Sequence, residues 1–363
     1  MDIDGYLKEK ERQFSELGER IRDPRVFDFN WLPDKPLMRD EIKPIVDALL
    51  RYERTGVPGH LLVTGSRGCG KTLALKYLQQ LFGERGLPVL YGNCRTRNTS
   101  YKLLADFVGA RARGFSLAEL TDKFTEKYAG PTIVVLDEVD LLSDRGRSME
   151  ILYFLSRSPR NDLVVMLSNN VNWASGLDES TRSTLQPETV YFRPYTAAEL
   201  QEILRDRAAR GLAEIPAGVV GQIAALAVKY TSSDVRVAIK TLYYWAADAD
   251  TPLEESFQRA RRDIVVEIVR SLNDKSLLIL KAAAQGERPV KQVYRDYRRL
   301  CASAKEEPFS YVYFSSTLAC LQSLGLVLLI TTKIRRAYTR LIQLTFPAEV
   351  LEGVWRYRFG TGA

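Results

Sequence analysis

One octapeptide, GSRGCGKT at residues 65–72, constrains the fold more than any other stretch of this chain. It fits the pattern G-x-x-x-x-G-K-[ST], between the apolar run HLLVT and the helical pattern TLALKYLQQLF. Glycines let backbone N–H groups turn toward phosphate oxygens, and the following helix adds its positive dipole end. A glycine turn that merely joins strand to helix would not explain the Lys-Thr pair. The predicted ligands of ATP or ADP are Gly65, Ser66, Arg67, Gly68, Cys69, Gly70, Lys71 and Thr72.

A second acidic motif, IVVLDEVD at 133–140, supplies the expected partner of this loop. A carboxylate at the end of a buried strand is costly unless it serves a cation. We therefore expect Asp137 to hold Mg²⁺ together with the Thr72 hydroxyl, and Glu138 to orient the attacking water. Asp140 is expected only to cap the next helix. The two acids favour hydrolysis of ATP over its storage.

The hydrophobic pattern changes twice along the chain and predicts three domains. Short apolar runs at 60–64, 87–93, 132–137, 163–168 and 189–192 alternate with helical stretches, which indicates a parallel α/β sandwich around the phosphate loop. Helices are then expected at 197–210, 216–229, 233–247 and 254–272, followed by three helices and two strands typical of a winged helix. The predicted domains are residues 1–194 for the α/β domain, residues 195–269 for a helical lid, and residues 270–363 for the winged helix.

Composition excludes several other classes of protein. The four cysteines are scattered and His60 is the only histidine, so we expect neither a zinc site nor structural disulfides. His60 is expected to pack against the strand that follows it or to face solvent. The longest apolar run, LGLVLLI, is too short to span a membrane, and the charged N-terminus lacks the apolar core of a signal peptide. A cytoplasmic location is expected.

The positive charge is concentrated at one end of the chain. From Arg270 onward there are 15 Lys and Arg against 7 Asp and Glu, whereas the preceding residues hold 37 against 38. Residues 308–348 contain no carboxylate. This asymmetry predicts a polyanion-binding module on a nearly neutral body. A cationic surface that is merely solvated is the alternative.

The motifs, in this order, resemble those of an AAA+ ATPase. In LVVMLSNN, Asn169 matches the family's first sensor, and in SSDVRVAIKTL, Arg236 matches the second-sensor arginine that reaches the phosphates from the lid. Further segments resemble archaeal origin-recognition initiators of the ORC/CDC type, over about residues 25–345. They are RVFDFNWLPDKPLMRDEI, LYGNCRTRNTSYKLLADF, LDESTRSTLQPETVYFRPYTAAELQEILRDRA, VYRDYRRLC and FSYVYFSSTLACLQSLGLV.

The chain departs from this family at three places. Family members often read LDPRVKSSL where this chain has LDESTRSTL, so Ser180 replaces the arginine that reaches a neighbour's ATP. Arg182 either takes that role or is a surface charge. Ser233 stands where a glycine commonly precedes the second-sensor Asp, and we interpret it as a helix cap. The wing, LITTKIRRAYTRL, contains no glycine to mark its turn.

The winged helix is the predicted contact with double-stranded DNA. Its recognition helix presents Ser310, Tyr311 and Tyr313 at the N-terminal end, although core packing explains the tyrosines equally well. The basic wing residues, expected on phosphates or in the minor groove, are Lys333, Arg335, Arg336 and Arg340. The recognition helix lacks strong base readers, so modest sequence specificity is expected. In the resembled family a loop of the ATPase domain also contacts DNA, which makes Arg111 and Arg113 candidates, with a solvated basic loop as the alternative.

The resemblance implies a replication initiator associated with the nucleoid. It would bind ATP and origin DNA, recruit or load the replicative helicase, self-associate on DNA, and hydrolyse ATP slowly to reset a switch. Two alternatives remain open from the sequence. One is a remodeller or clamp-loader-type motor, which needs an effective arginine in trans; the other is a nucleotide-sensing regulator of transcription. A relative that serves the origin of a mobile element would differ only in its partner.

Overall fold

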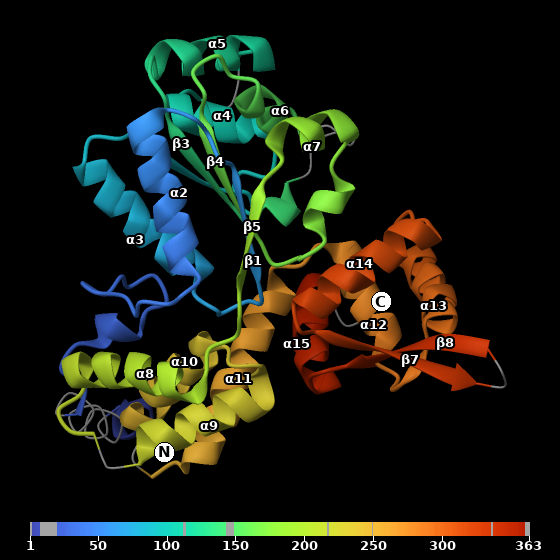
Figure 1. Cartoon of the computed structure of the whole chain (residues 1–363). Helices are drawn as coiled ribbons and strands as arrows, with labels where there is room; N and C mark the ends of the chain where they lie inside the picture. Colours follow the sequence, from blue (N-terminus) through green and yellow to red (C-terminus); the bar gives the residue numbers. More distant parts are fainter. Residues whose placement is uncertain are drawn as a thin grey trace. The chain divides into compact units, whose positions relative to one another are not determined.

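The computed structural model describes residues 2–7, 20–111, 114–142, 149–215, 218–248, 250–334 and 337–359. The chain divides into two compact units, which are described separately here (Figure 1). One contains residues 30–195, and the other combines residues 1–29 with residues 196–363. The division into three domains that begin at residues 1, 195 and 270 stays a prediction.

The unit of residues 30–195 is built on a five-stranded parallel sheet, which confirms the predicted α/β class. The strands are β1 (Leu61–Gly65), β2 (Val89–Asn93), β3 (Ile133–Asp137), β4 (Leu163–Ser168) and β5 (Glu188–Phe192), in the order β2-β3-β4-β1-β5. Every pairing is parallel. The strands β1, β3 and β4 are buried along their whole length, because both faces of the sheet are covered.

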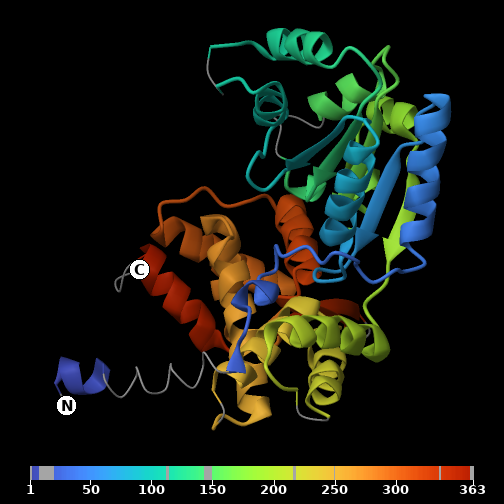
Figure 2. The same ribbon diagram turned by 90° about the vertical axis from the view of Figure 1, so that its left-hand side faces the viewer.

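Two hydrophobic clusters flank this sheet, since successive side chains of a strand point to opposite faces. Leu61 and Val63 pack with α2 (Ile42–Thr55) and α3 (Lys71–Glu84). Leu62 packs with residues of α4 (Ser100–Val108), α5 (Leu117–Lys127) and α6 (Glu150–Ser156) on the other face (Figure 2). The shorter elements of this unit are η2 (Val139–Leu141), η3 (Trp173–Gly176) and α7 (Glu179–Leu185).

The second unit begins its longer segment with four helices, as predicted from the pattern change after β5. They are α8 (Ala197–Gly211), α9 (Val219–Thr231), α10 (Val235–Ala247) and α11 (Leu253–Arg270). A capping box formed by Thr196 and Glu199 starts α8. The short helix η1 (Pro24–Phe27) packs against α8, because Gly211 leaves room there: a Cβ at this glycine would lie 2.4 Å from Val26.

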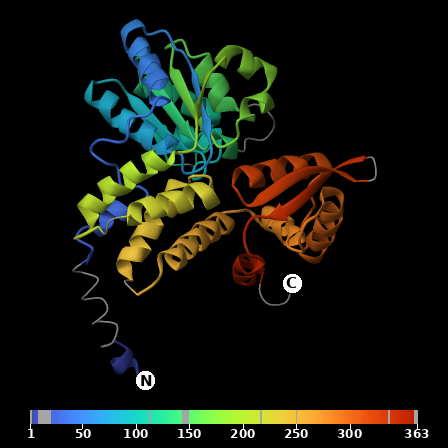
Figure 3. The ribbon, with the colours of Figure 1, turned by 60° about the horizontal axis from the view of Figure 1, so that its bottom comes forward.

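The remainder of this unit has the elements of a winged helix. Its helices are α12 (Asp274–Ala283), α13 (Val290–Ser303) and α14 (Tyr311–Ser323), and its strands are β6 (Arg288–Pro289), β7 (Val327–Ile334) and β8 (Ala337–Leu344). The antiparallel order is β6-β8-β7, with β7 and β8 forming the hairpin seen in Figure 3. A final helix, α15 (Ala348–Phe359), was not predicted; Leu351 and Trp355 bury its inner face.

The interpretation of Ser233 as a helix cap is wrong. The N-cap of α10 is Asp234, whose side chain accepts the Arg236 N–H at 3.0 Å. Ser233 lies one residue earlier with a φ of 63°, a left-handed conformation that glycine adopts without strain. This backbone conformation explains a glycine at the corresponding position of relatives.

Within the described part of the chain, no helix is both long enough and apolar enough to cross a membrane.

Candidate functional site: a phosphate loop and its acidic partners

The phosphate loop joins β1 to α3 and leaves no room for side chains at two of its glycines. Gly65 has a φ of 151°, and a Cβ there would lie 2.4 Å from the carbonyl oxygen of Phe192. Gly70 has a φ of 93°, and a Cβ there would lie 2.1 Å from the hydroxyl of Tyr195. Such approaches are far below van der Waals contact, so the backbone of this loop depends on glycine at both positions.

Lys71 begins α3 and is buried in the middle of the loop. Its Nζ donates to the carbonyl oxygens of Gly65 at 2.7 Å and Ser66 at 2.9 Å, and to Oδ1 of Asn169 at 3.1 Å. Burial lowers the pKa of Lys71. Among the described residues, the buried Oγ of Ser66 has no hydrogen-bond partner. Nζ also lies 3.6 Å from the Cys69 sulfur. A buried ammonium with neutral acceptors around it, beside an unused hydroxyl, fits a site for phosphate groups.

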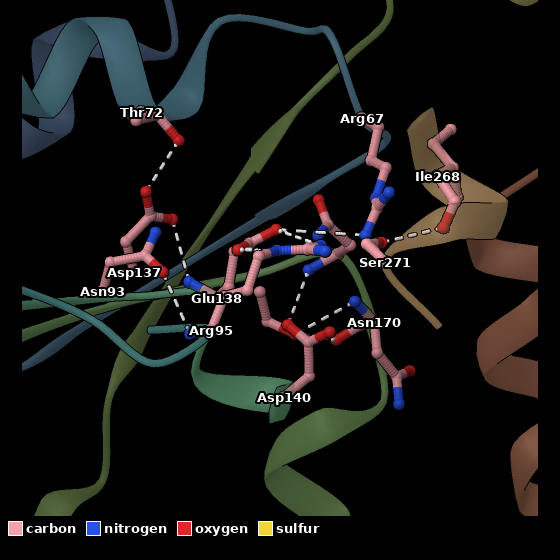
Figure 4. Close-up of polar contacts among 12 residues, drawn as sticks. Arg67, Thr72, Asn93, Arg95, Asp137, Glu138, Asp140, Asn170, Ile268 and Ser271 are labelled. Atoms are coloured by element: carbon pink, nitrogen blue, oxygen red, sulfur yellow. Dashed lines mark hydrogen bonds and ion pairs between the residues drawn. The ribbon is translucent and has the colours of Figure 1, made fainter. Parts of the chain in front are cut away.

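Asp137 stands at the end of β3 and meets the residue predicted to share Mg²⁺ with it. Its Oδ2 accepts the Thr72 hydroxyl at 2.9 Å, and its Oδ1 accepts the Glu138 N–H at 2.8 Å (Figure 4). Oδ2 also accepts the Tyr91 hydroxyl at 2.5 Å. Burial raises the pKa of Asp137, and the two hydroxyl donors act against this rise. Carboxylate and hydroxyl oxygens are ligands suited to Mg²⁺.

Tyr91 was missed by the sequence analysis, although strand alternation offered a signal for it. Asn93 pairs in register with Asp137. Tyr91 lies two residues earlier on β2, on the same face of the sheet as Asn93. Only the alignment of β2 with β3 places its hydroxyl against the Asp137 carboxylate.

Glu138 is held by two arginines rather than standing free. Nε of Arg95 lies 2.7 Å from Oε2 and Nη2 lies 2.9 Å from Oε1, so both carboxylate oxygens accept from one guanidinium (Figure 4). Nη2 of Arg67 lies 3.9 Å from Oε1. Burial alone would raise the pKa of Glu138, but the hydrogen bonds and charge of Arg95, with the charge of Arg67, hold it below its usual range. A lower pKa makes this carboxylate a weaker acceptor for the proton of water.

Asp140 supports the loop after β4, which corrects the expectation that it caps a helix. Its Oδ1 accepts the Ser168 hydroxyl at 3.0 Å and the Asn169 N–H at 3.2 Å. The next helix, α6, has Met149 at its N-cap. Asp140 therefore fixes the backbone that presents the Asn169 amide to Lys71.

Arg39, a buried residue before α2, was also missed. Its Nη1 donates to the carbonyl oxygen of Cys69 at 2.9 Å, and its Nη2 donates to that of Arg193 at 2.9 Å and to Glu41 at 3.1 Å. The guanidinium lies over the Tyr195 ring, 4.4 Å from its centroid. One side chain thus connects the phosphate loop to the segment that follows β5. No sequence pattern distinguishes it from a surface arginine.

The remaining candidates of this unit lie at its surface. Arg182 is exposed on α7 and has no ion pair within the described ranges, and Ser180 accepts a hydrogen bond from Arg157 at 3.3 Å. Arg111 is exposed, and Arg113 lies outside the described residues. Their roles stay predictions.

The second-sensor candidate belongs to the other unit. Arg236, in the first turn of α10, contacts Asp234 through Nη2 at 2.6 Å and Nε at 3.0 Å. This local pair holds the guanidinium beside the N-cap of its own helix. The predicted contact of Arg236 with a nucleotide stays a prediction.

The predicted DNA contacts of the winged helix are exposed where they are described. Ser310 caps α14 through the Tyr313 N–H, at 3.3 Å. Tyr311 and Tyr313 are 41% and 58% exposed, with their rings packed on Tyr294 and Phe309 respectively. The tyrosines therefore lie at the surface rather than in the core. Lys333 and Arg340 are exposed on β7 and β8, while Arg335 and Arg336 lie outside the described residues.

This strand order, with the phosphate loop after β1 and an acidic pair at the end of β3, is that of an AAA+ ATPase domain. Comparison with known proteins agrees: the AAA domain family matches residues 54–169. The chain is 28% identical over 337 residues to ORC1-type DNA replication protein 3 of Sulfurisphaera tokodaii, covering 85% of this chain and 86% of that one. It is 26% identical to the ORC1-type DNA replication protein of Pyrococcus furiosus, with 90% and 87% covered.

Solved structures extend the similarity beyond the ATPase domain. The Aeropyrum pernix ORC1 protein in complex with DNA matches with a TM-score of 0.68 and 25% identity, over 94% of this chain and 97% of that one. Cdc6p of Pyrobaculum aerophilum shares the fold, with a TM-score of 0.57, 21% identity, and 93% and 99% covered. The chain is thus similar over most of its length to archaeal ORC1-type and Cdc6-type AAA+ proteins, which agrees with the resemblance predicted from the sequence motifs.

Proposed function

We propose that this protein is an ATP-binding replication initiator that recognises origins in duplex DNA. The observation that carries the proposal is the presence, in one chain, of a complete phosphate site and a winged helix without carboxylates over residues 308–348. The ORC1 protein of Aeropyrum pernix, which has been solved in complex with DNA, is similar over 94% of this chain. We place its activity in the cytoplasm, on the nucleoid.

In this proposal the phosphate loop binds ATP or ADP, with Lys71 on the β- and γ-phosphates. Thr72 and Asp137 would hold Mg²⁺, which neutralises phosphate charge when it is bound. Glu138 orients the attacking water, and Asn169 contacts the γ-phosphate. The contact between Thr72 and Asp137 supports the shared metal.

Hydrolysis serves as a slow switch rather than as a motor. The pairing of Glu138 with Arg95 supports a low rate, because the carboxylate must leave the guanidinium before it can accept from water. Arg236 would signal the nucleotide state from the lid, and Arg182 could act on a neighbour's nucleotide where copies assemble on DNA. Recruitment or loading of the replicative helicase is the proposed output.

Contact with DNA is assigned to the winged helix. Ser310, Tyr311 and Tyr313 would meet the major groove, since the N-terminal end of a recognition helix contacts base edges. Lys333, Arg335, Arg336 and Arg340 would follow phosphates. Arg111 and Arg113 are proposed as a second contact from the ATPase domain.

A genomic pull-down tests the proposal directly. Purified full-length protein with ATP is mixed with sheared DNA of its own source at near-physiological salt, and the retained DNA is sequenced. Enrichment of one or a few intergenic loci is expected, and it should be lost with K71A. Retention at many promoters would replace the initiator with a transcription regulator. Uniform recovery would contradict origin recognition and favour the motor.

The dependence of DNA affinity on salt concentration tests the contribution of the wing separately. Each phosphate contact contributes about −0.9 to the slope of log affinity against log salt. The double variant K333E/R340E should therefore flatten the slope by about 1.8. An unchanged slope would remove β7 and β8 from the interface.

A further inference from the structure

The outward face of α14 is made of small, mostly apolar side chains. Phe314, Leu318 and Leu321 bury the inner face of this helix. The exposed positions at helical spacing are Val312, Ser316 and Ala319. Val312 is 77% exposed, so its methyl groups are accessible to a partner.

Two hydroxyl groups on and beside this face are already engaged within the helix. The Ser316 hydroxyl donates to the carbonyl oxygen of Val312 at 3.2 Å, and the Thr317 hydroxyl donates to that of Tyr313 at 2.9 Å. The helix contains no Arg, Lys, Asn, Asp or Glu, and its one amide, Gln322, lies in the last turn. Val312 and Ala319 therefore offer methyl groups on this face, beside the exposed tyrosines at the N-terminal end of the helix.

The charge around this face selects nucleic acid as its partner. Residues 308–348 hold no carboxylate, and the neighbouring hairpin exposes Lys333 and Arg340. An apolar helix face with basic residues around it is complementary to a polyanion that has apolar groups between its charged groups. In the major groove of duplex DNA that group is the C5-methyl of thymine, and alanine, the methyl of threonine and similar side chains contact it.

We propose that Val312 and Ala319 make α14 a reader of thymine methyl groups, so that this protein selects its sites by apolar contact rather than by hydrogen bonds to bases. The inference rests on the proposed binding of duplex DNA by the winged helix. Small side chains also let the helix backbone approach the groove closely. Burial of one methyl group corresponds to about a fourfold gain in affinity.

Deoxyuridine provides the test, because it keeps every hydrogen-bonding group of thymidine and lacks only the methyl. A preferred duplex is first selected from a random pool by the full-length protein with ATP. Each thymidine of that duplex is then replaced singly by deoxyuridine, and the dissociation constant is measured. We expect one or two positions to weaken binding about fourfold.

Two variants connect this effect to α14. V312A and, independently, A319G should reduce the penalty at their own thymidine, while the salt slope stays that of the parent protein. V228A is a matched control, because Val228 is a half-exposed valine on α9. The inference would be overturned if deoxyuridine had no effect at any position, or if no preferred sequence were selected. It would also be overturned if both α14 variants showed the same deoxyuridine penalty as the parent protein. Failure to bind any duplex would instead overturn the proposed function, and the inference with it.

Discussion

Replacement of Arg95 by methionine should speed ATP hydrolysis. Both oxygens of the Glu138 carboxylate accept from the Arg95 guanidinium, at 2.7 and 2.9 Å. In the proposed function Glu138 orients the attacking water, so this ion pair must loosen before the chemical step. Methionine replaces the apolar stem of arginine but offers neither charge nor donor. The free energy of the pair is then removed from the barrier.

The structure sets the size of this effect. A hydrogen bond to a charged group contributes about 1.5–3 kcal/mol when it is protected from water. The side chains of Arg95 and Glu138 keep 33% and 19% of their exposure, which reduces the contribution toward that of a surface pair, to about 1 kcal/mol. Since each 1.4 kcal/mol changes a rate about tenfold, kcat should rise about fivefold.

A steady-state ATPase assay with a nucleotide-binding titration measures both quantities. The R95M variant should gain in kcat without a change in ATP affinity, because the Arg95 guanidinium bonds Glu138, which is not one of the residues assigned to the phosphates. R97M is the matched control, since Arg97 lies on the same loop but pairs with Asp106. A fall in kcat for R95M would refute the reasoning, because it would mean that Arg95 places Glu138 for catalysis instead of restraining it.

Three further predictions concern stability. G70A should lose nucleotide affinity and lower the melting temperature, because its Cβ would meet the Tyr195 hydroxyl; the double variant G70A/Y195F should recover part of the loss, and no recovery would place the damage in backbone strain alone. His60 is buried with Nδ1 accepting the Val164 N–H at 3.1 Å, and burial lowers its pKa from 6.5. Its stabilising contribution is therefore full above pH 6.5 and declines as the pH falls below that value. The variant H60N, whose Oδ1 can accept the same N–H, should show a smaller fall in melting temperature between pH 7 and pH 5 than the parent protein. An identical fall in both proteins would show that His60 does not cause the pH dependence of stability. S233G should raise stability by about 0.5 kcal/mol, because relief of left-handed strain of about 1–2 kcal/mol outweighs the added backbone entropy of glycine; a lower unfolding midpoint in urea would show that the serine side chain is stabilising.

The sequence predicted those parts of the site whose functional residues are neighbours in the chain and form a recognisable motif. The loop at 65–72 and the acids after the run IVVL were found because a parallel sheet aligns the carboxyl ends of its strands, whatever the strand order. The Thr72–Asp137 contact followed from that rule. The strand runs were equally readable, since strands buried on both faces are uninterrupted apolar segments.

The partners that modify this chemistry were not predictable, because each depends on a register or a packing direction. Arg95 reaches Glu138 only because the loop after β2 turns beside the end of β3, and Glu138 itself takes a φ of 53°. An arginine two residues past a strand end is otherwise an ordinary surface residue. The helix α15 was missed although Pro347 directly before it and Glu349 in its first turn are signals of a helix start.

Arg39 shows what such a hidden partner contributes. Its two Nη atoms bond the carbonyl oxygens of Cys69 and Arg193, which lie in the phosphate loop and just past β5. Arg193 is fixed a second time, because its N–H and Nε both approach the Glu41 carboxylate, at 3.3 and 3.2 Å. A shift of the loop on nucleotide binding must therefore either break a buried hydrogen bond to a charged group, at a cost of about 1.5–3 kcal/mol, or carry residues 193–195 with it. Arg39 therefore connects the phosphate loop to the segment that leaves the sheet, in addition to the packing of Tyr195 against Gly70.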